Sequence, residues 1–437
     1  MLRNRFAALA GATLVAGALL AAAPAGAAMA RNSVAGTHGG AARAPMLQPS
    51  ALSVHLTGLG RQAGGAGALH AAAGPAAGVI NAAFNTDSCT GSAAMHTLFC
   101  LGGGFALGAR HTNGLTEVST GGTWTARTPM RLPATKNREV LANEVSCATA
   151  GRKHDCVMVG DHFTAANSGS QLAELWTGKW RILTAANPPG TTLSALDDVS
   201  CTSTTFCMMV GSAGGTHTSH ATAYSWNGRQ LRRLSVPAPA KTSTAILGGL
   251  SCATRASCVA VGGFTKGGRF LAYAATWNGR AWKTRTLPNA KGERQTILEA
   301  VSCPRAGRCV AVGEGAEPGA RTVAELLTGG SWRILPTPAR TSSGLIGVDC
   351  PGVGRCFAAG FAGRLSLAET WNGRTWTVQR TPRTPAPFNG TQLLHVSCVS
   401  SSRCEAVGSR FNPKNLNRTL AESWNGHSWQ IQKTANP

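Results

Sequence analysis

An all-β fold, a seven-bladed β-propeller with four-stranded blades, is predicted by three features of this 437-residue sequence. Its fourteen cysteines fall into seven pairs, short apolar runs alternate with Gly, Asn-Gly and Pro turn signals, and one pattern recurs about every 50 residues. Such a period, with four short strands in each copy, is typical of propeller blades. A β-helix is the alternative, but its coils are far shorter and lack hairpin turns.

Composition agrees with short strands joined by many turns. Hydrophobic residues make up 43% of the chain, charged residues only 14%, and there are 54 glycines. Lys and Arg total 41 against 18 Asp and Glu, which gives a net charge of +23. A surplus of this size indicates anionic partners, although it could equally serve only to keep the protein soluble.

The first 30 residues read as an export signal. Arg3 and Arg5 precede an apolar run over residues 6–23, and small residues at 25–30 offer cleavage sites. An uncleaved membrane anchor is the alternative, but the run is short and rich in alanine. Residues 31–78 predict a flexible Ala/Gly-rich lead-in with a possible edge strand at 51–57, and residues 79–437 the propeller. We therefore expect an extracellular, secreted product without a membrane span once the signal is removed.

The cysteines predict one disulfide inside each blade, between its first and second strands. Successive pairs start 58, 54, 51, 51, 47 and 48 residues apart. The two cysteines of a zinc-binding pair usually stand about two to four residues apart, whereas five of these pairs have five residues between their cysteines. An even count in an exported chain also favours disulfides, so no metal site is expected. The predicted pairs are Cys89 with Cys100, Cys147 with Cys156, Cys201 with Cys207, Cys252 with Cys258, Cys303 with Cys309, Cys350 with Cys356, and Cys398 with Cys404.

The turn between the third and fourth strands predicts the register of each blade. In the sixth copy Asn372-Gly373 suits a two-residue hairpin, because both residues tolerate positive φ. This places Glu369 opposite Trp376, and the same count in the seventh copy places Glu422 opposite Trp429. Five glutamates share this position in their copies, so we interpret them as framework rather than as catalysts: Glu117, Glu174, Glu325, Glu369 and Glu422.

Binding is predicted on one side of the ring. Turns between strands one and two, and between three and four, share one side, whereas the variable loops and the blade-to-blade connections lie opposite. The variable side carries a set of basic residues for which we predict an anionic polymer or carbohydrate, although they could also be dispersed, solvated charges. The set is Arg131, Lys136, Arg138, Lys266, Arg269, Lys291, Arg294, Arg321, Arg383, Arg410, Lys414 and Arg418.

Motifs for catalysis are weak. His217 and His220 stand three apart in a variable loop and could clamp a metal, but no acidic residue is near them in sequence. His154, Asp155, Asp161 and His162 form an equally nonspecific group. No Gly-x-Ser-x-Gly elbow, phosphate loop or dinucleotide fingerprint occurs, so no cofactor is expected. Aromatic platforms for nucleic-acid bases are also lacking, because the aromatics occupy repeat positions.

The repeat resembles exported propeller proteins of high-GC actinobacteria. The motifs that carry this resemblance are Val301-Ser302-Cys303, Val310–Gly313 and Leu420–Trp429. Paired glycines in strand two, such as Gly262-Gly263, and the tryptophan of strand four are similar to kelch repeats, the family of the central domain of galactose oxidase. The turn Gly373–Trp376 resembles the Asp-box of sialidases. These resemblances imply a ring with a central channel, used for carbohydrate work or for protein contacts.

Neither family's activity carries over to these residues. Trp371 stands where the Asp-box aspartate would be, and both tyrosines, Tyr224 and Tyr273, fall inside predicted strands. We therefore predict a monomeric, non-catalytic binding module for a polymer of the cell wall or matrix. The alternative is a hydrolase or lyase acting on polysaccharide. That alternative requires acidic residues or histidines to converge at the channel, with Asp161, His162, His217, His220 and Glu314 as candidates.

Overall fold

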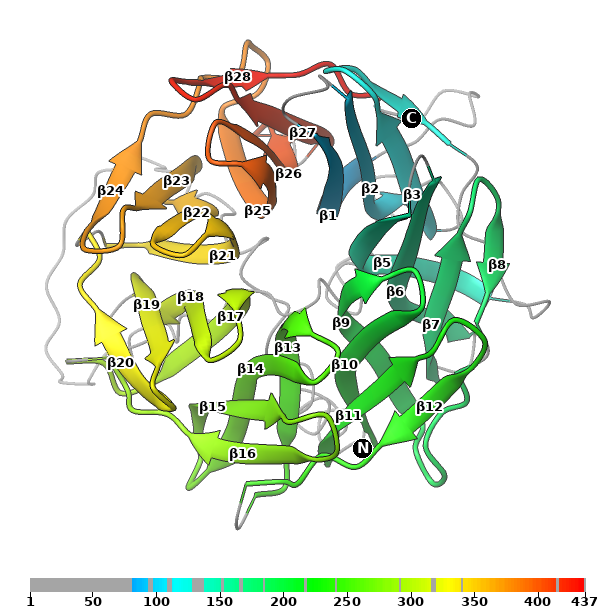
Figure 1. Ribbon diagram of the computed structural model, residues 1–437. Helices are drawn as coiled ribbons and strands as arrows, with labels where there is room; N and C mark the ends of the chain where they lie inside the picture. Colours follow the sequence, from blue (N-terminus) through cyan, green and yellow to red (C-terminus); the bar gives the residue numbers. More distant parts are fainter. Residues whose placement is uncertain are drawn as a thin grey trace, which may run out of the picture.

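The chain forms four-stranded units that follow one another around a central axis, the arrangement of a β-propeller (Figure 1). The computed structural model describes residues 81–92, 97–107, 112–127, 137–150, 153–164, 168–183, 185–215, 218–239, 242–290, 292–315, 320–338, 341–413 and 416–435. The predicted export signal, lead-in and edge strand therefore lie outside the described residues, and the domain boundaries stay predictions. Within these ranges no helix is long and apolar enough to cross a membrane.

The described residues form 28 strands, four in each of seven consecutive units. Units 1 to 4 contain β1 (Asn81–Ser92), β2 (Thr97–Leu107), β3 (Thr112–Ser119), β4 (Trp124–Ala126); β5 (Asn137–Ala150), β6 (Lys153–Thr164), β7 (Gly169–Trp176), β8 (Trp180–Ile182); β9 (Leu193–Ser203), β10 (Phe206–Gly214), β11 (Ser219–Trp226), β12 (Leu231–Leu234); β13 (Ala245–Thr254), β14 (Ser257–Lys266), β15 (Arg269–Trp277) and β16 (Trp282–Thr286). Units 5 to 7 contain β17 (Thr296–Arg305), β18 (Arg308–Gly315), β19 (Arg321–Thr328), β20 (Ser331–Leu335); β21 (Ser343–Gly352), β22 (Arg355–Ala362), β23 (Leu365–Trp371), β24 (Trp376–Gln379); β25 (Gly390–Ser400), β26 (Arg403–Phe411), β27 (Asn417–Trp424) and β28 (Trp429–Ile431).

Strands within a unit are antiparallel neighbours in chain order. Units 3 to 7 are separate four-stranded sheets, whereas a single parallel bridge between Thr112 and Glu139 joins units 1 and 2 into one eight-stranded sheet. The first strand of each unit lies nearest the axis and the fourth lies at the rim (Figure 1). The expected fold of repeated four-stranded units is thus supported.

Apolar side chains pack between neighbouring units. Seven buried clusters each combine residues of two adjacent units, and one of them joins Phe84 and Trp124 of unit 1 to Val407 and Ala421 of unit 7. Unit 7 therefore packs on unit 1 much as consecutive units pack on each other. Burying apolar surface contributes roughly 25 cal/mol per Å², so these clusters stabilise the packing of neighbouring units.

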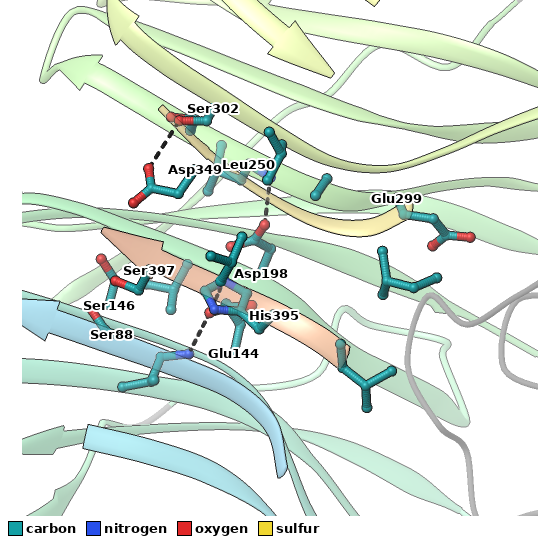
Figure 2. A pocket seen from close by; sticks show the side chains of 18 of the residues that line it. Ser88, Glu144, Ser146, Asp198, Leu250, Glu299, Ser302, Asp349, His395 and Ser397 are labelled. Atoms are coloured by element: carbon teal, nitrogen blue, oxygen red, sulfur yellow. Dashed lines mark hydrogen bonds and ion pairs between the residues drawn. The ribbon is translucent and has the colours of Figure 1, made fainter. Parts of the chain in front are cut away.

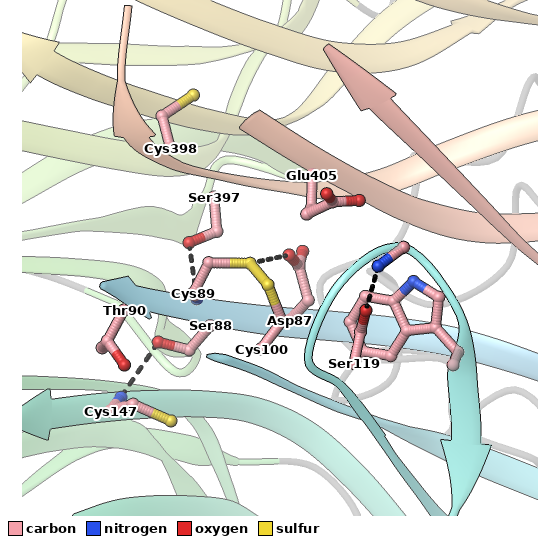
Figure 3. The surroundings of a disulfide bond; sticks show 12 residues. Asp87, Ser88, Cys89, Thr90, Cys100, Ser119, Cys147, Ser397, Cys398 and Glu405 are labelled. Atoms are coloured by element: carbon pink, nitrogen blue, oxygen red, sulfur yellow. Dashed lines mark hydrogen bonds between the residues drawn. A yellow bond between two sulfur atoms is a disulfide. The ribbon is translucent and has the colours of Figure 1, made fainter. Parts of the chain in front are cut away.

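A second set of contacts links the first strands near the axis. The residue before each first cysteine accepts a hydrogen bond from the backbone N–H of the cysteine in the next unit. Six of these acceptors are serines, and Asp349 takes the place in unit 6 with an N–O distance of 2.7 Å. Figure 3 shows Ser88 against Cys147 and Ser397 against Cys89, and the second of these bonds joins unit 7 to unit 1.

The C-terminal residues add a third link between units 7 and 1. The backbone N–H of Trp124 donates to the carbonyl of Lys433, and the indole N–H donates to the side chain of Gln432, at 2.9 and 2.8 Å. Glu117 accepts a further hydrogen bond from the backbone of Ala435. The end of the chain is thus bonded to the outer strands of the first unit.

Every first strand carries a β-bulge four residues before its first cysteine. The register with the second strand shifts there in all seven units, for example between Ala142 and Glu144 and between Leu393 and His395. A bulge inserts one extra residue and re-aims the neighbouring side chains. These bulges were not predicted from the sequence, because no single residue type is shared by the seven bulge positions.

The predicted hairpin register is wrong. Trp371 lies opposite Trp376 and Glu369 opposite Val378, and in unit 7 Trp424 lies opposite Trp429 and Glu422 opposite Ile431. The loop has four residues instead of two, because the Asn372 side chain accepts hydrogen bonds from the N–H groups of residues 374 and 375. Only the glycine of this loop has positive φ, at 91°. An Asx-turn therefore replaces the expected Asn-Gly hairpin turn.

The recurring glutamates occupy the interior, as expected of framework residues. All five side chains are fully buried in the third strands, which leaves no surface for a substrate. Burial raises the pKa of Glu325 to about 7 and, against a hydrogen bond from Ser366 of the neighbouring unit, that of Glu422 to about 8. Burial therefore favours the neutral, protonated form of Glu325 and Glu422.

All seven predicted disulfides are formed, one in each unit, and each joins the first strand to the second. Within the described residues no cysteine is free. The first-strand members are Cys89, Cys147, Cys201, Cys252, Cys303, Cys350 and Cys398. Their second-strand partners are, in the same order, Cys100, Cys156, Cys207, Cys258, Cys309, Cys356 and Cys404.

This pairing predicts the thiol count of the protein. We expect the native protein to expose no alkylatable thiol and to gain fourteen labels after denaturation and reduction, because every cysteine has a partner. Intact mass before and after reduction measures this. More than two labels on the native secreted protein would contradict the pairing.

The serine link between units 7 and 1 can be tested against a link inside the chain. Ser397→Ala leaves the N–H of Cys89 without its acceptor, so it should lower the free energy of unfolding by about 1–3 kcal/mol. Ser251→Ala, which removes the link between units 4 and 5, should cost a similar amount, and the exposed Ser401→Ala should cost little. Denaturant unfolding measures all three. An effect of Ser251→Ala without one of Ser397→Ala would mean that units 7 and 1 are not bonded in solution.

Candidate ligand-binding face and axial pocket

The loops between second and third strands and the connections between units share one side of the molecule, which we call the loop face. Thr265 donates its backbone N–H to Thr244 of the preceding connection, and Phe270 donates to the side chain of Gln295 in the following one. Thr391, where unit 7 begins, bonds in the same way to Arg364. The expected separation of the two kinds of turn onto two faces is therefore found in the described segments.

Seven of the twelve predicted basic residues are described with their side chains, and all seven belong to segments of the loop face. They are Lys266, Arg269, Arg294, Arg321, Arg383, Arg410 and Arg418. Arg138 lies at the start of β5, and four of the set fall outside the described residues: Arg131, Lys136, Lys291 and Lys414. The seven come from units 4, 5 and 7 and the connections beside them, so they are spread around the face. Arg410 and Arg418 are brought together directly opposite each other across β26 and β27.

Arg410 and Arg418 belong to a cluster where unit 6 meets unit 7, which we call the seam cluster: Arg364, Phe388, Arg410, Phe411 and Arg418. The guanidinium of Arg364 lies 5.0 Å from the ring centre of Phe411, and that of Arg410 lies 4.6 Å from the ring centre of Phe388. Such stacking holds the guanidinium planes in place. Arg364, Phe388 and Phe411 were not predicted to belong to the site, because they lie in three different segments of the chain.

Two electrostatic effects in the seam cluster oppose the positive charge of Arg410. Burial and, second, the charge of Arg418 hold the pKa of Arg410 below its ordinary value. The Nε of Arg410 is buried without a hydrogen-bond acceptor. Like charges directly opposite each other on a sheet are destabilising. This end of unit 7 therefore favours the approach of an anion.

The histidines and acids proposed as catalytic candidates do not converge. His154 stacks on Phe99 with ring centres 4.5 Å apart near one end of β6, whereas Asp161 and His162 lie toward its other end. His220 is in unit 3 and Glu314 in unit 5, and His217 is outside the described residues. None of the four described candidates, Asp161, His162, His220 and Glu314, lines the pocket at the axis.

A different set of acidic residues does meet at the axis. A cavity of about 270 Å³, which we call the axial pocket, is lined by first-strand residues of all seven units. Figure 2 shows Glu144, Asp198, Asp349 and His395 projecting into this region from different units. Its acidic members are Asp87, Glu144, Asp197, Asp198, Glu299 and Asp349. The bulge residue of every unit lines the pocket, and two of the acidic members, Asp197 and Glu299, are bulge residues.

The axial pocket was not predicted from the sequence. Its acidic residues differ from copy to copy, and an interpretation built on repeated positions passes over them. Alignment of the copies on Ser-Cys would have exposed the signal, because the residue three before the cysteine is Glu144, Asp198 or His395 in some copies and Gly249, Ala300 or Gly347 in others. Carboxyl groups at this position, three residues before the first cysteine, are unexpected in a strongly basic chain and therefore indicate a candidate site.

His395 is clamped between carboxylates of two other units. Its Nδ1 lies 2.9 Å from an oxygen of Asp87, and its Nε2 lies 3.4 Å from an oxygen of Glu144. Burial opposes the charge of the ring, but Glu144, Asp87 and Asp198 together raise the pKa of His395 to about 10. Burial raises the pKa of Asp87 and of Glu144, against the effect of His395. When protonated on both nitrogens, His395 forms ion pairs with carboxylates of units 1 and 2 and so ties unit 7 to both.

Comparison with known proteins supports the fold and goes no further. The chain matches no protein-family model and no curated protein. The polysaccharide lyase PL25, an ulvan lyase, superposes with a TM-score of 0.51 and 9% identity over 82% of this chain and 97% of that one. YCF48 from Cyanidioschyzon merolae gives a TM-score of 0.45 with 12% identity over 77% of this chain and 97% of that one. The fucose-specific lectin from Aleuria aurantia gives a TM-score of 0.45 with 9% identity over 83% of this chain and 99% of that one. The kelch, Asp-box and actinobacterial resemblances stay predictions.

The clamp on His395 predicts a pH dependence of stability. The folded pKa of about 10 lies above the ordinary value of 6.5, so the contribution of the clamp is complete below about pH 6.5 and is lost as pH rises through 10. We expect the ring ¹⁵N signals of His395 to show both nitrogens protonated at about pH 8, above the usual histidine range. The His395→Gln variant assigns these signals. A neutral ring at that pH would contradict the clamp.

Proposed function

We propose that this protein is a secreted, non-catalytic binding module for an anionic carbohydrate polymer, and that the polymer lies on the loop face across the seam cluster. One observation carries the proposal: two arginines lie directly opposite each other across a hairpin, one of them with a buried Nε that has no acceptor. A carboxylate or sulfate would remove the repulsion and supply acceptors in the fork geometry that arginine prefers.

The surroundings of the arginines suit a sugar chain. Phe388 and Phe411 each have an arginine stacked on the ring and lie beside Asn389, which accepts a hydrogen bond from Arg364 at 3.1 Å. Mixed aromatic and polar surfaces on loops of a rigid scaffold are typical of binding sites. The other basic residues of the loop face would then attract the polymer at longer range.

An extracellular location supports this choice of ligand. Seven disulfides are typical of an oxidising compartment, and polymers of the cell wall and matrix occur outside the cell. The ulvan lyase with the same kind of fold has been solved bound to -[GlcA(1-4)Rha3S]-. We take that saccharide as the first probe.

A second candidate function is hydrolysis or lysis of a polysaccharide. It is favoured by the convergence of carboxyl groups from several units in the axial pocket. Against it, both ring nitrogens of His395 are occupied by carboxylates, so this ring is not free to act as a base at neutral pH. Appearance of new reducing ends from the polymers tested for binding would favour the enzyme.

Binding should depend on the seam cluster and on salt. Arg410→Gln and Arg418→Gln should each weaken binding of an acidic polysaccharide about tenfold, because each removes a charge-assisted hydrogen bond. Affinity should also fall steeply as salt is raised, since exposed charges are screened. A glycan and wall-polymer array with a salt series, followed by calorimetry on the best ligand, measures both effects.

Arg280→Gln and Arg374→Gln are matched controls, because both arginines sit in exposed turns between third and fourth strands on the opposite face. These variants should bind as the parent protein does. Binding that ignores salt, or that falls equally in all four variants, would overturn the proposal.

A further inference from the structure

The axial pocket has an uneven wall. Three residues before the first cysteine, units 7, 2 and 3 carry His395, Glu144 and Asp198, whereas units 4 and 5 carry Gly249 and Ala300. The small residues follow from close approach of the strands, since a Cβ on Gly249 would lie 2.7 Å from the carbonyl oxygen of Glu299. The charged groups at this position therefore gather on one arc of the pocket.

Structural bonds occupy several of the carboxylates. Asp87 and Glu144 hold His395, and one oxygen of Asp198 accepts the N–H of Leu250 at 2.6 Å. Asp349 accepts the N–H of Cys398 in the serine series. These contacts account for the framework of the pocket but leave Asp197 without a framework role.

Two amide oxygens in the pocket lack partners. Asn85 donates its NH₂ group to the carbonyl of Ala142, and Asn143 donates to Asp161 and to the carbonyl of Leu196. The Oδ1 atoms of both asparagines are buried without a hydrogen bond, and Asn143 as a whole is only 8% exposed. A buried oxygen without a donor costs about 1–3 kcal/mol, so a ligand that supplies N–H groups would be favoured here.

Charge selects the ligand further. The lining contains six carboxyl groups and no Lys or Arg, and its single cationic side chain, His395, already holds two carboxylates. Burial, followed by repulsion from Asp161, raises the pKa of Asp197, and burial followed by repulsion from Glu144 raises that of Asp198. A cation would relieve both effects. Glu144 and His395 keep 15% and 22% of their side-chain surface exposed, so solvent reaches the pocket.

We propose that the axial pocket binds a primary ammonium group, carried by a small alkylamine or by an amino sugar. An ammonium offers three N–H donors and a full charge in a compact shape, which suits the unpartnered amide oxygens and the carboxylates. The volume of about 270 Å³ is at the lower end for ligand pockets and holds one small molecule rather than a polymer segment. A bare metal ion fits less well, because within the described ranges no three His, Cys, Asp or Glu side chains are placed to hold one.

The test uses the full secreted protein with four probes: 1,5-diaminopentane, glucosamine, N-acetylglucosamine and Ca²⁺. Calorimetry or ligand-observed NMR should show binding of at least one of the two amines and none of N-acetylglucosamine, which keeps the sugar ring but lacks the charge. The stronger of the two amines identifies the source of the ammonium. Failure of both amines, equal binding of the acetylated sugar, or displacement of the amines by Ca²⁺ at equal concentration would overturn the proposal.

Asp197→Asn locates the site. It removes one charge without changing the shape and relieves repulsion from Asp161, so the variant should fold, which denaturant unfolding checks. We expect its amine affinity to fall at least about tenfold. Asp155→Asn, away from the pocket in β6, is the matched control and should bind as the parent does. Unchanged binding in Asp197→Asn would overturn the assignment. Arg410→Gln should keep amine binding, so this result is separate from that for the polymer.

Discussion

The arrangement of the seven units depends on one repeated hydrogen bond. The first cysteine of each unit donates its backbone N–H to the residue that precedes the first cysteine of the previous unit. Each one fixes the first strand of a unit at a set height against its neighbour, while the disulfide one residue further fixes the second strand to the first. The apolar clusters between units then pack in register. Because Ser397 bonds to Cys89 as its counterparts bond within the chain, the same rule also joins the last unit to the first.

The molecule separates its charges by position. Arginines and lysines lie on both faces of the molecule, whereas the axis gathers carboxylates with a single histidine. The basic surplus of the whole chain therefore says little about its centre. An anionic polymer attracted to the loop face would be repelled from the axial pocket, and a small cation would be drawn into it. Two ligands of opposite charge could thus be bound without competing.

Sequence reasoning reached the parts of this protein that repeat. The cysteine pairs, four strands in each unit, the buried glutamates and the division into two faces all follow from regular spacing. It failed where side chains override backbone preference: Asn372 caps its own turn, so Trp371 faces Trp376 and the count from a two-residue turn shifts by two. It also missed the axial pocket, whose signal emerges only when the copies are aligned on their first cysteines, and the seam cluster, whose residues lie in three separate segments.

The bulge in each first strand has a consequence for how such a protein could change over evolution. The bulge residue lies at the axis and is not part of the apolar clusters between units. It is also not one of the residues that accept the N–H of the next unit's cysteine. Substitution at Asn85, Asn143, Asp197, Gly248, Glu299, Ile346 or Leu394 could therefore alter the chemistry of the centre while the scaffold stays intact. Each unit contributes one such variable position to the axial pocket, so two proteins that share every framework residue could still accept different small molecules.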